Sequence, residues 1–310
     1  MKPRSLKMRK LLLAAALLFS MIGNGCYGEW SSAGDPGVYR CSLDTWWGTS
    51  PVRAANAGEY LYILDNSANV YRYTFDPSRE CAYEWDRNFA SLGTASLSGF
   101  ADDIAFAGTS LYWNTGNTIE LYGDDLWNCS INSGEMALTA SAALVGGRNG
   151  VREYRFNASG CTPSGAAFSG AAFVLAIDTD GSRVFTAEAL ALSETAPERL
   201  VIYDRAGGNA LIRTALSPLA ESEMHFCSAT RIRRSNAGIL LLDSECETLG
   251  VFDDNGIFQK RIDLKAHGIR SAKDLYVSGN DAYILTASSL YLSYRLSLGT
   301  LLGNSSYNEL

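Results

Sequence analysis

The sequence predicts an all-β domain built from a short antiparallel unit that repeats along the chain. Apolar and polar residues alternate with the period of two typical of a half-buried strand, and no long amphipathic helix follows the first 25 residues. Gly, Asn and Asp recur between the apolar runs, where tight turns need them. The 310 residues are 47% hydrophobic and 19% charged, a composition typical of a globular protein rather than a disordered one.

The repeat is a strand, a turn centred on Gly, and a second strand. Three clear copies are Arg53–Asp65, Asp103–Asn114 and Asp274–Thr286, and two weaker copies are Leu175–Phe185 and Thr230–Leu240. Asn236 stands where the other copies have Gly, so we expect it to adopt the positive φ that Gly allows. A third and a fourth strand follow, as in 200–216 and 249–264, which makes each unit a four-stranded meander.

The spacing of the turns predicts how many units there are. The turn centres at 58, 108, 181, 236 and 279 leave one gap, between 108 and 181, wide enough for a further unit at 134–161. Six units of about 44 residues match the size of a β-propeller blade. The last unit has only three obvious strands, so we expect the N-terminal strand at 37–42 to supply the fourth and close the ring. A seven-bladed ring and a two-sheet β-domain are the alternatives.

Two short motifs carry a resemblance to a known kind of propeller. Asp103–Tyr112 has the form Asp-Ile-x-x-x-Gly-x-x-Leu-Tyr, and Tyr203–Gly207 has the form Tyr-Asp-x-x-Gly. These elements resemble six-bladed β-propellers of the NHL or TolB-like kind, over residues 38–298. The motifs are generic to propellers, so the resemblance implies a fold and no particular activity.

The N-terminus predicts export. Five of the first ten residues are Lys or Arg, and the apolar run at 11–22 is interrupted only by Ser20, which is the pattern of a secretory signal peptide at 1–25. The run is shorter than the roughly 20 residues that span a bilayer. It resembles a bacterial lipoprotein signal, which implies lipidation of Cys26, a tether at 26–37, the propeller at 38–298 and a C-terminal tail at 299–310. Ordinary cleavage that leaves Cys26 as a thiol or disulfide partner is the alternative.

The cysteines agree with an oxidising compartment. Apart from Cys26, six remain, enough for three disulfides: Cys41, Cys81, Cys129, Cys161, Cys227 and Cys246. Their spacing does not select a connectivity, but Cys227 and Cys246 fall within one repeat and are the first pair that we expect. No Cys-x-x-Cys spacing indicates zinc. The alternative is that some of them are buried free thiols.

A candidate ligand site lies where one unit leads into the next. Its members are His225, His267, Trp46, Trp47, Asp103 and Asp274, which the propeller hypothesis places around the mouth of the central channel. Such a set suits a flat ligand, or Ca²⁺ or another divalent ion. The alternative is that the histidines are unrelated loop residues and the acids are turn formers. We expect the basic cluster at 231–234 to be a solvated face.

The function that these observations favour is binding rather than catalysis. The formal net charge of −7 argues against nucleic acid, and no Gly-x-Ser-x-Gly or phosphate-binding glycine motif occurs. We expect an envelope lipoprotein, anchored to the outer membrane by lipid alone, that binds a protein, peptide or glycan without a cofactor. The alternatives are a metal-dependent hydrolase or lyase that works in the central channel, and a structural surface or adhesin component.

Overall fold

The protein is all-β, as the sequence predicts. The computed structural model describes residues 37–43, 50–57, 60–76, 82–85, 103–132, 134–168, 173–189, 198–216, 225–287 and 293–303. Trp46, Trp47, Cys26 and Cys81 lie outside these ranges, as do the predicted signal peptide and almost all of the tether. Within the described ranges, no helix has the length and apolar character needed to cross a membrane.

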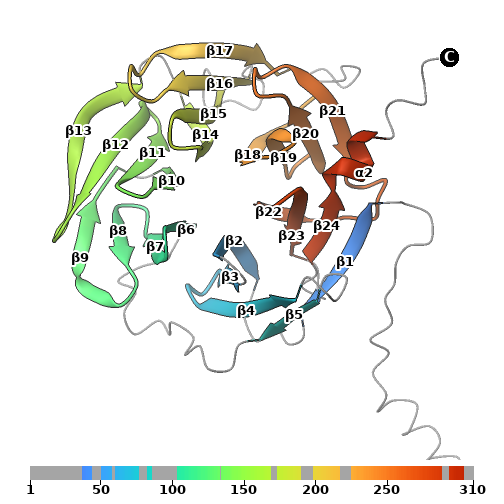
Figure 1. Ribbon diagram of the computed structural model, residues 1–310, viewed down its shortest axis with the longest axis horizontal. Coiled ribbons are helices and arrows are strands. Elements are labelled where there is room, and N and C mark those ends of the chain that lie inside the picture. The colour runs from blue at the N-terminus through green and yellow to red at the C-terminus, as the bar shows by residue number, and fades with distance from the viewer. Residues whose placement is uncertain are drawn as a thin grey trace, which may run out of the picture. The chain divides into compact units, whose positions relative to one another are not determined.

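Consecutive strands form antiparallel meanders that are arranged around a central axis (Figure 1). Blade 1 is β2 (Pro51–Ala57), β3 (Tyr60–Asp65), β4 (Val70–Asp76) and β5 (Ala82–Trp85); blade 2 is β6 (Asp103–Ala107), β7 (Ser110–Asn114), β8 (Thr118–Leu121) and β9 (Asp124–Ser130). Blade 3 is β10 (Glu135–Thr139), β11 (Ala142–Gly147), β12 (Gly150–Asn157) and β13 (Gly160–Phe168); blade 4 is β14 (Phe173–Thr179), β15 (Arg183–Ala189), β16 (Glu198–Asp204) and β17 (Ala210–Ala215). Blade 5 is β18 (Ala229–Ser235), β19 (Gly238–Asp243), β20 (Thr248–Phe252) and β21 (Phe258–Asp263); blade 6 is β22 (Ala272–Ser278), β23 (Asp281–Thr286), β24 (Ser293–Ser297) and β1 (Val38–Leu43).

Strand β1 closes the ring, which confirms the sequence prediction. It pairs antiparallel with β24, with Val38 opposite Leu296 and Cys41 opposite Ser293. The innermost strands β2, β6, β10, β14, β18 and β22 lie against one another in that cyclic order, and β22 returns to β2. The fold is therefore a closed β-propeller, with the first and last parts of the described chain in one blade.

The outer strands join some of the blades. Strand β1 pairs in parallel with β5, with Ser42 opposite Ala82, and this links blades 6 and 1. Strand β13 pairs in parallel with β9, with Gly160 opposite Asn128, and this links blades 3 and 2. Blades 4 and 5 remain separate four-stranded sheets in the described part of the chain.

The core lies between the blades. Every residue of β19 and β20 is buried, because these strands carry apolar side chains on both faces and lie between two neighbouring blades. Leu240 and Leu249 pack toward blade 6, whereas Leu241 and Phe252 pack toward blade 4. Each fully buried side chain of this kind contributes about 1.5–3 kcal/mol.

The antiparallel order gives the ring two different faces. We call one the turn face; it carries the hairpin turns between the first and second and between the third and fourth strands of each blade. The other, which we call the loop face, carries the connections between blades and those between second and third strands. On the turn face, Asn236 Nδ2 donates to Asn280 Oδ1 at 3.2 Å and so joins the turns of blades 5 and 6.

The expectation of a positive φ at Asn236 is wrong. Among the described residues, the non-glycine positions with positive φ are Ala68, Glu247 and Ser271. Ser235 pairs with Gly238 across a two-residue turn, and it is Gly238 that takes a φ of +125°. A Cβ on Gly238 would lie 2.1 Å from the carbonyl oxygen of Phe252, so this position needs glycine both for its φ and for its lack of a side chain.

Two disulfides lie within the described residues. Cys227–Cys246 confirms the pair expected from the sequence, and Cys129–Cys161 links β9 to β13, which brings a covalent bond to the junction of blades 2 and 3. Cys41 is disulfide-bonded as well. Residues 299–303, expected as the start of a tail, belong to helix α2 (Leu298–Gly303), whose Leu298 and Leu301 pack into the core.

Candidate functional site

The centre of the ring contains a network of charged side chains from the innermost strands. Those that converge are Arg53 on β2, Asp103 on β6, Glu135 on β10, Asp178 on β14, Arg231 and Arg233 on β18, and Asp274 on β22. Each innermost strand thus supplies at least one charge. Three of these side chains, those of Asp103, Arg231 and Asp274, are buried, so their charges need partners within the protein.

Arg231 is the hub of this network. Its Nε donates to Asp274 Oδ1 at 2.8 Å, its Nη2 donates to Asp103 Oδ1 at 3.3 Å, and its Nη1 donates to Glu135. These partners belong to blades 6, 2 and 3, so the guanidinium reaches across the channel from blade 5. Arg53 lies beside the same acids, with Nη2 at 3.3 Å from Glu135 and Nε at 3.7 Å from Asp103.

Burial dominates the electrostatics of the two channel aspartates. It raises the pKa of Asp103 to about 6, against the opposing effect of Arg53 and Arg233. Burial likewise raises the pKa of Asp274, again against Arg233 and Arg53, although its Oδ2 also accepts the Ala54 N–H at 2.6 Å. Desolvation therefore exceeds the attraction of the arginines at both carboxyl groups.

The prediction that residues 231–234 form a solvated face is wrong for Arg231, which is 2% exposed. Strand alternation correctly groups Arg231 with Arg233, but it does not say whether their shared side faces bulk water or the channel. Glu135 was not predicted, since nothing in the sequence near it differs from an ordinary strand start. The sequence did not show that Arg231 is buried close to Asp103 and Asp274, the two aspartates that it did predict.

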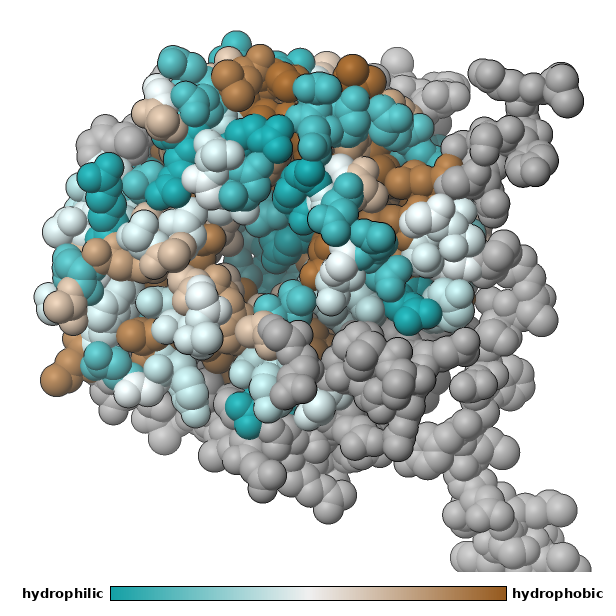
Figure 2. Space-filling view, viewed as in Figure 1, coloured by the Kyte–Doolittle hydropathy of each residue, from teal (hydrophilic) through white to brown (hydrophobic). Residues whose placement is uncertain are grey.

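The channel also contains a cavity of about 210 Å³. Residues from all six innermost strands line it, and Asp178, Arg233 and Arg234 are its charged members. Figure 2 shows the centre of the viewed face hollowed, with both hydrophilic and hydrophobic residues around it. The volume is below the roughly 300–1,000 Å³ typical of small-molecule sites, so this cavity suits water or a small ion better than a substrate.

Polar residues at the ends of the second strands stabilise the turns that follow them. Asp65 Oδ1 accepts the N–H groups of Ser67 and Asn69 at 2.9 and 2.8 Å. Asp243 Oδ1 accepts those of Glu245 and Cys246 at 3.0 and 2.9 Å. These contacts fit the turn-forming role that the sequence offered as the alternative to a calcium site.

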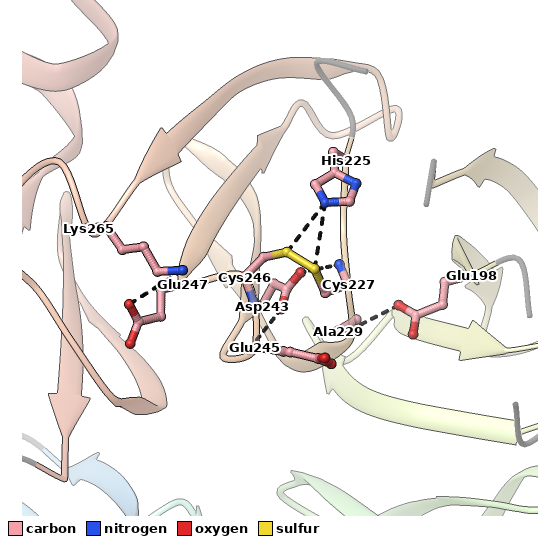
Figure 3. Close-up of a disulfide and its surroundings, with 9 residues drawn as sticks. All are labelled: Glu198, His225, Cys227, Ala229, Asp243, Glu245, Cys246, Glu247 and Lys265. Carbon is pink, nitrogen blue, oxygen red and sulfur yellow. Dashed lines mark hydrogen bonds and ion pairs between the residues drawn. A yellow bond between two sulfur atoms is a disulfide. The ribbon is translucent and has the colours of Figure 1, made fainter. Parts of the chain in front are cut away.

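The Cys227–Cys246 disulfide lies at the loop face with His225 directly against it (Figure 3). His225 Nε2 is 3.4 Å from Cys246 Sγ and 3.6 Å from Cys227 Sγ. All three residues are partly exposed. His225 Nδ1 is buried and has no hydrogen-bond partner in the described part of the chain.

Acidic side chains surround this disulfide. Asp243 Oδ2 accepts the Cys227 N–H at 2.5 Å, and Glu198 accepts the Ala229 N–H at 3.0 Å (Figure 3). Burial raises the pKa of Glu198 to about 7, and the neighbouring charges of Asp243 and Glu245 add to the shift. The local potential is therefore negative, which favours cations.

The residues of the predicted ligand site have separate surroundings. Asp103 and Asp274 come together at Arg231, whereas His225 contacts the disulfide sulfurs. His267 lies in the connection between β21 and β22, where its backbone N–H donates to the Leu264 carbonyl at 3.2 Å. Trp46 and Trp47 lie outside the described residues. A single site made of all six residues stays a prediction.

Comparisons with known proteins identify the fold. No model of a known protein family matches the chain, and no curated protein does. Solved structures do match. One is the WD40 β-propeller domain of Doa1, with a TM-score of 0.55 and 12% identity over 84% of this chain and 96% of that one. Another is a chain of the mitotic checkpoint complex, with a TM-score of 0.51 and 14% identity over 85% of this chain and 78% of that one. The protein is a β-propeller.

Proposed function

We propose that this protein is a non-catalytic binding module that contacts its partner through the loop face. The observation that carries the proposal is the difference in length between the connections of the two faces. On the turn face, every hairpin turn between the strands contains two to five residues. On the loop face, the connection from β5 to β6 spans residues 86–102 and that from β17 to β18 spans 216–228.

Connections of such length are uncommon in compact domains and usually serve a function. A propeller needs only a few residues to pass from an outer strand to the next innermost strand, as the connections at 131–134 and 169–172 demonstrate. The connections at 86–102 and 216–228 are therefore longer than the passage from one blade to the next requires. Loops on a rigid scaffold are where binding residues concentrate.

The channel supports a binding role over an enzymatic one. Asp103, Glu135 and Asp274, the acids best placed to hold a catalytic metal, already have the Arg231 guanidinium as their cation. The partner that we propose is a protein, a peptide or a glycan. We propose further that this propeller is of the six-bladed NHL or TolB-like kind.

We also propose that the binding module acts at a bacterial cell envelope, attached to the outer membrane through a lipid on Cys26. The basic and apolar N-terminal segment supports export, and the disulfides suit an oxidising compartment. Replacing Cys26 with Ala is expected to move the protein from the membrane fraction to the soluble fraction of lysed cells. Unchanged membrane retention would contradict the anchor and leave the binding proposal standing.

The binding face can be tested by placing a photo-crosslinking amino acid at matched positions. Asn149 is exposed on the loop face of blade 3, and Ser141 is exposed on the turn face of the same blade. We expect a discrete crosslinked product in living cells from Asn149, identified by mass spectrometry, and none from Ser141. Equal products from both positions, or a product from Ser141 alone, would contradict a loop-face partner.

The rival function, a metal-dependent hydrolase or lyase in the channel, makes a different prediction. It requires Ca²⁺ or another divalent ion to stabilise the wild-type domain, by about 2.7 kcal/mol at 100 times its Kd. Thermal unfolding of the oxidised domain, with its disulfides intact, in a panel of ions and beside a His225→Ala/His267→Ala double variant, separates the two. A shift that the double variant loses would favour the enzyme, and no shift with any ion favours the binding module.

A further inference from the structure

We infer that Cys227, Cys246 and His225 form a zinc site when the disulfide between the two cysteines is reduced. The inference concerns the disulfide cluster alone and is independent of the proposed binding function. It rests on the geometry of three ligand atoms, on how the backbone holds the cysteines, and on the charge of the surroundings.

The distances from the histidine to the two sulfurs already match a tetrahedral site. With Zn–S bonds of about 2.3 Å and a Zn–N bond of about 2.0–2.1 Å, tetrahedral angles separate nitrogen from sulfur by about 3.6 Å. His225 Nε2 lies 3.4 Å from Cys246 Sγ and 3.6 Å from Cys227 Sγ. The imidazole would therefore need little movement to bind the ion.

The sulfurs themselves have to separate. In the disulfide they share a bond of about 2.0 Å, whereas two thiolates on one zinc ion lie about 3.8 Å apart. The Cα atoms of Cys227 and Cys246 are 5.6 Å apart, so rotation of the two side chains can supply this change without moving the strands. Reduction by a dithiol leaves two cysteine thiols and one oxidised dithiol, and zinc binding then releases the two thiol protons.

Asp243 holds both cysteines in place whether or not they are bonded to each other. Its Oδ2 accepts the Cys227 N–H at 2.5 Å, and its Oδ1 accepts the Cys246 N–H at 2.9 Å (Figure 3). Asp243 is fully buried at the end of β19, itself buried along its whole length. The backbone of the site is thus fixed by the blade rather than by the disulfide.

The surroundings favour a cation and allow it to enter. The carboxyl groups of Glu198, Asp243 and Glu245 lie near one another beside the disulfide. All three ligand residues are partly exposed, so both a reductant and an ion can reach them. Three protein ligands leave a fourth position for water, an arrangement that zinc sites with two Cys and one His use.

The other disulfide is a matched control. Cys129 is 1% exposed and lies in the apolar cluster between blades 2 and 3, together with Ile119, Trp127 and Tyr154. No histidine lies near it, since the chain has only His225 and His267 and both belong to the connections before β18 and β22. Reduction of this pair should therefore create no metal site.

The test is a Co²⁺ titration of the propeller domain, reduced with a phosphine, in which cobalt serves as the spectroscopic probe for zinc. We expect the thiolate charge-transfer band and the intense visible bands of a tetrahedral ion, with one Co²⁺ bound per chain and displaced by Zn²⁺. The oxidised domain should show neither band. The Cys129→Ser/Cys161→Ser variant should behave like the wild type, whereas His225→Ala should bind at least about 100-fold more weakly. Absence of tetrahedral bands in the reduced wild type, or unchanged affinity in His225→Ala, would overturn the inference.

Discussion

Replacing Arg231 with Met is the most informative perturbation of the fold. Arg231 is 2% exposed and holds Asp274 Oδ1 at 2.8 Å and Asp103 Oδ1 at 3.3 Å. In the variant, Asp103 keeps Arg53 at 3.7 Å, but Asp274 loses its closest cation while it stays fully buried. Removing one partner of a buried ion pair costs about 3–5 kcal/mol, because the remaining charge is uncompensated. We expect a loss of that size in the free energy of unfolding.

Urea denaturation of the propeller domain measures this loss directly, and thermal unfolding should show a decrease of about 6–10 °C at roughly 2 °C per kcal/mol. The loss should be smaller at acidic pH, because burial raises the pKa of Asp274, and once this carboxyl group binds a proton it no longer needs the guanidinium. The dependence on pH distinguishes lost charge compensation from lost packing, which has no reason to change over this range.

Arg155→Met is the matched control, since Arg155 pairs with Glu153 at 3.4 Å but is 71% exposed. Exposed pairs contribute about 0–1 kcal/mol, so this variant should be nearly as stable as the wild type. Adding Asp274→Asn to Arg231→Met should recover at least about 1 kcal/mol, since the uncompensated charge is then gone. A cost for Arg231→Met no larger than that of Arg155→Met would refute the role of Arg231 as the hub.

Three further predictions concern other parts of the propeller. Burial raises the pKa of Glu198 from 4.5 to about 7, so the folded state binds this proton more tightly. The stability that Glu198 contributes, measured against the Glu198→Gln variant, is therefore full below pH 4.5 and is lost as the pH rises through 7. Urea denaturation of both proteins across that range checks this. A difference between them that does not change with pH would contradict it. Replacing Cys129 and Cys161, 32 residues apart, with Ala should lower the free energy of unfolding by about 3–4 kcal/mol. Gly238→Ala should lower the free energy of unfolding by about 2–4 kcal/mol, because the new Cβ would lie 2.1 Å from a backbone oxygen. Gly279→Ala should cost about 1 kcal/mol, because the space around Gly279 is open. Equal losses in urea denaturation would refute the steric argument.

The parts of the fold that follow local rules were predictable from the sequence. The closure by β1 followed from a spare strand before the first repeat and a missing strand in the last, both visible in the chain. The Cys227–Cys246 pair followed from the position of both residues in one repeat. Each of these predictions needed only the order of the strands.

The channel network was beyond the reach of such rules. Arg231 finds its partners 43, 96 and 128 residues away, on three other blades. Strand periodicity assigns a side chain to one side of a strand, but only the assembled ring determines that this side faces a closed channel instead of bulk water. The sequence therefore placed Asp103 and Asp274 in the channel, but it assigned Arg231, the cation between them, to the surface.

The same network makes a prediction about calcium that reverses the expectation for a metal enzyme. If Asp103, Glu135 and Asp274 were built to hold an ion, Ca²⁺ would stabilise the wild-type domain. With Arg231 among them, the acids already have their positive charge, and an added ion would have to displace it. We therefore expect Ca²⁺ to leave the thermal unfolding of the wild type unchanged and to stabilise Arg231→Ala, in which three carboxylates face the vacated volume. Stabilisation of the wild type alone would contradict this account, because the arginine would then not be the cation that the channel was built around.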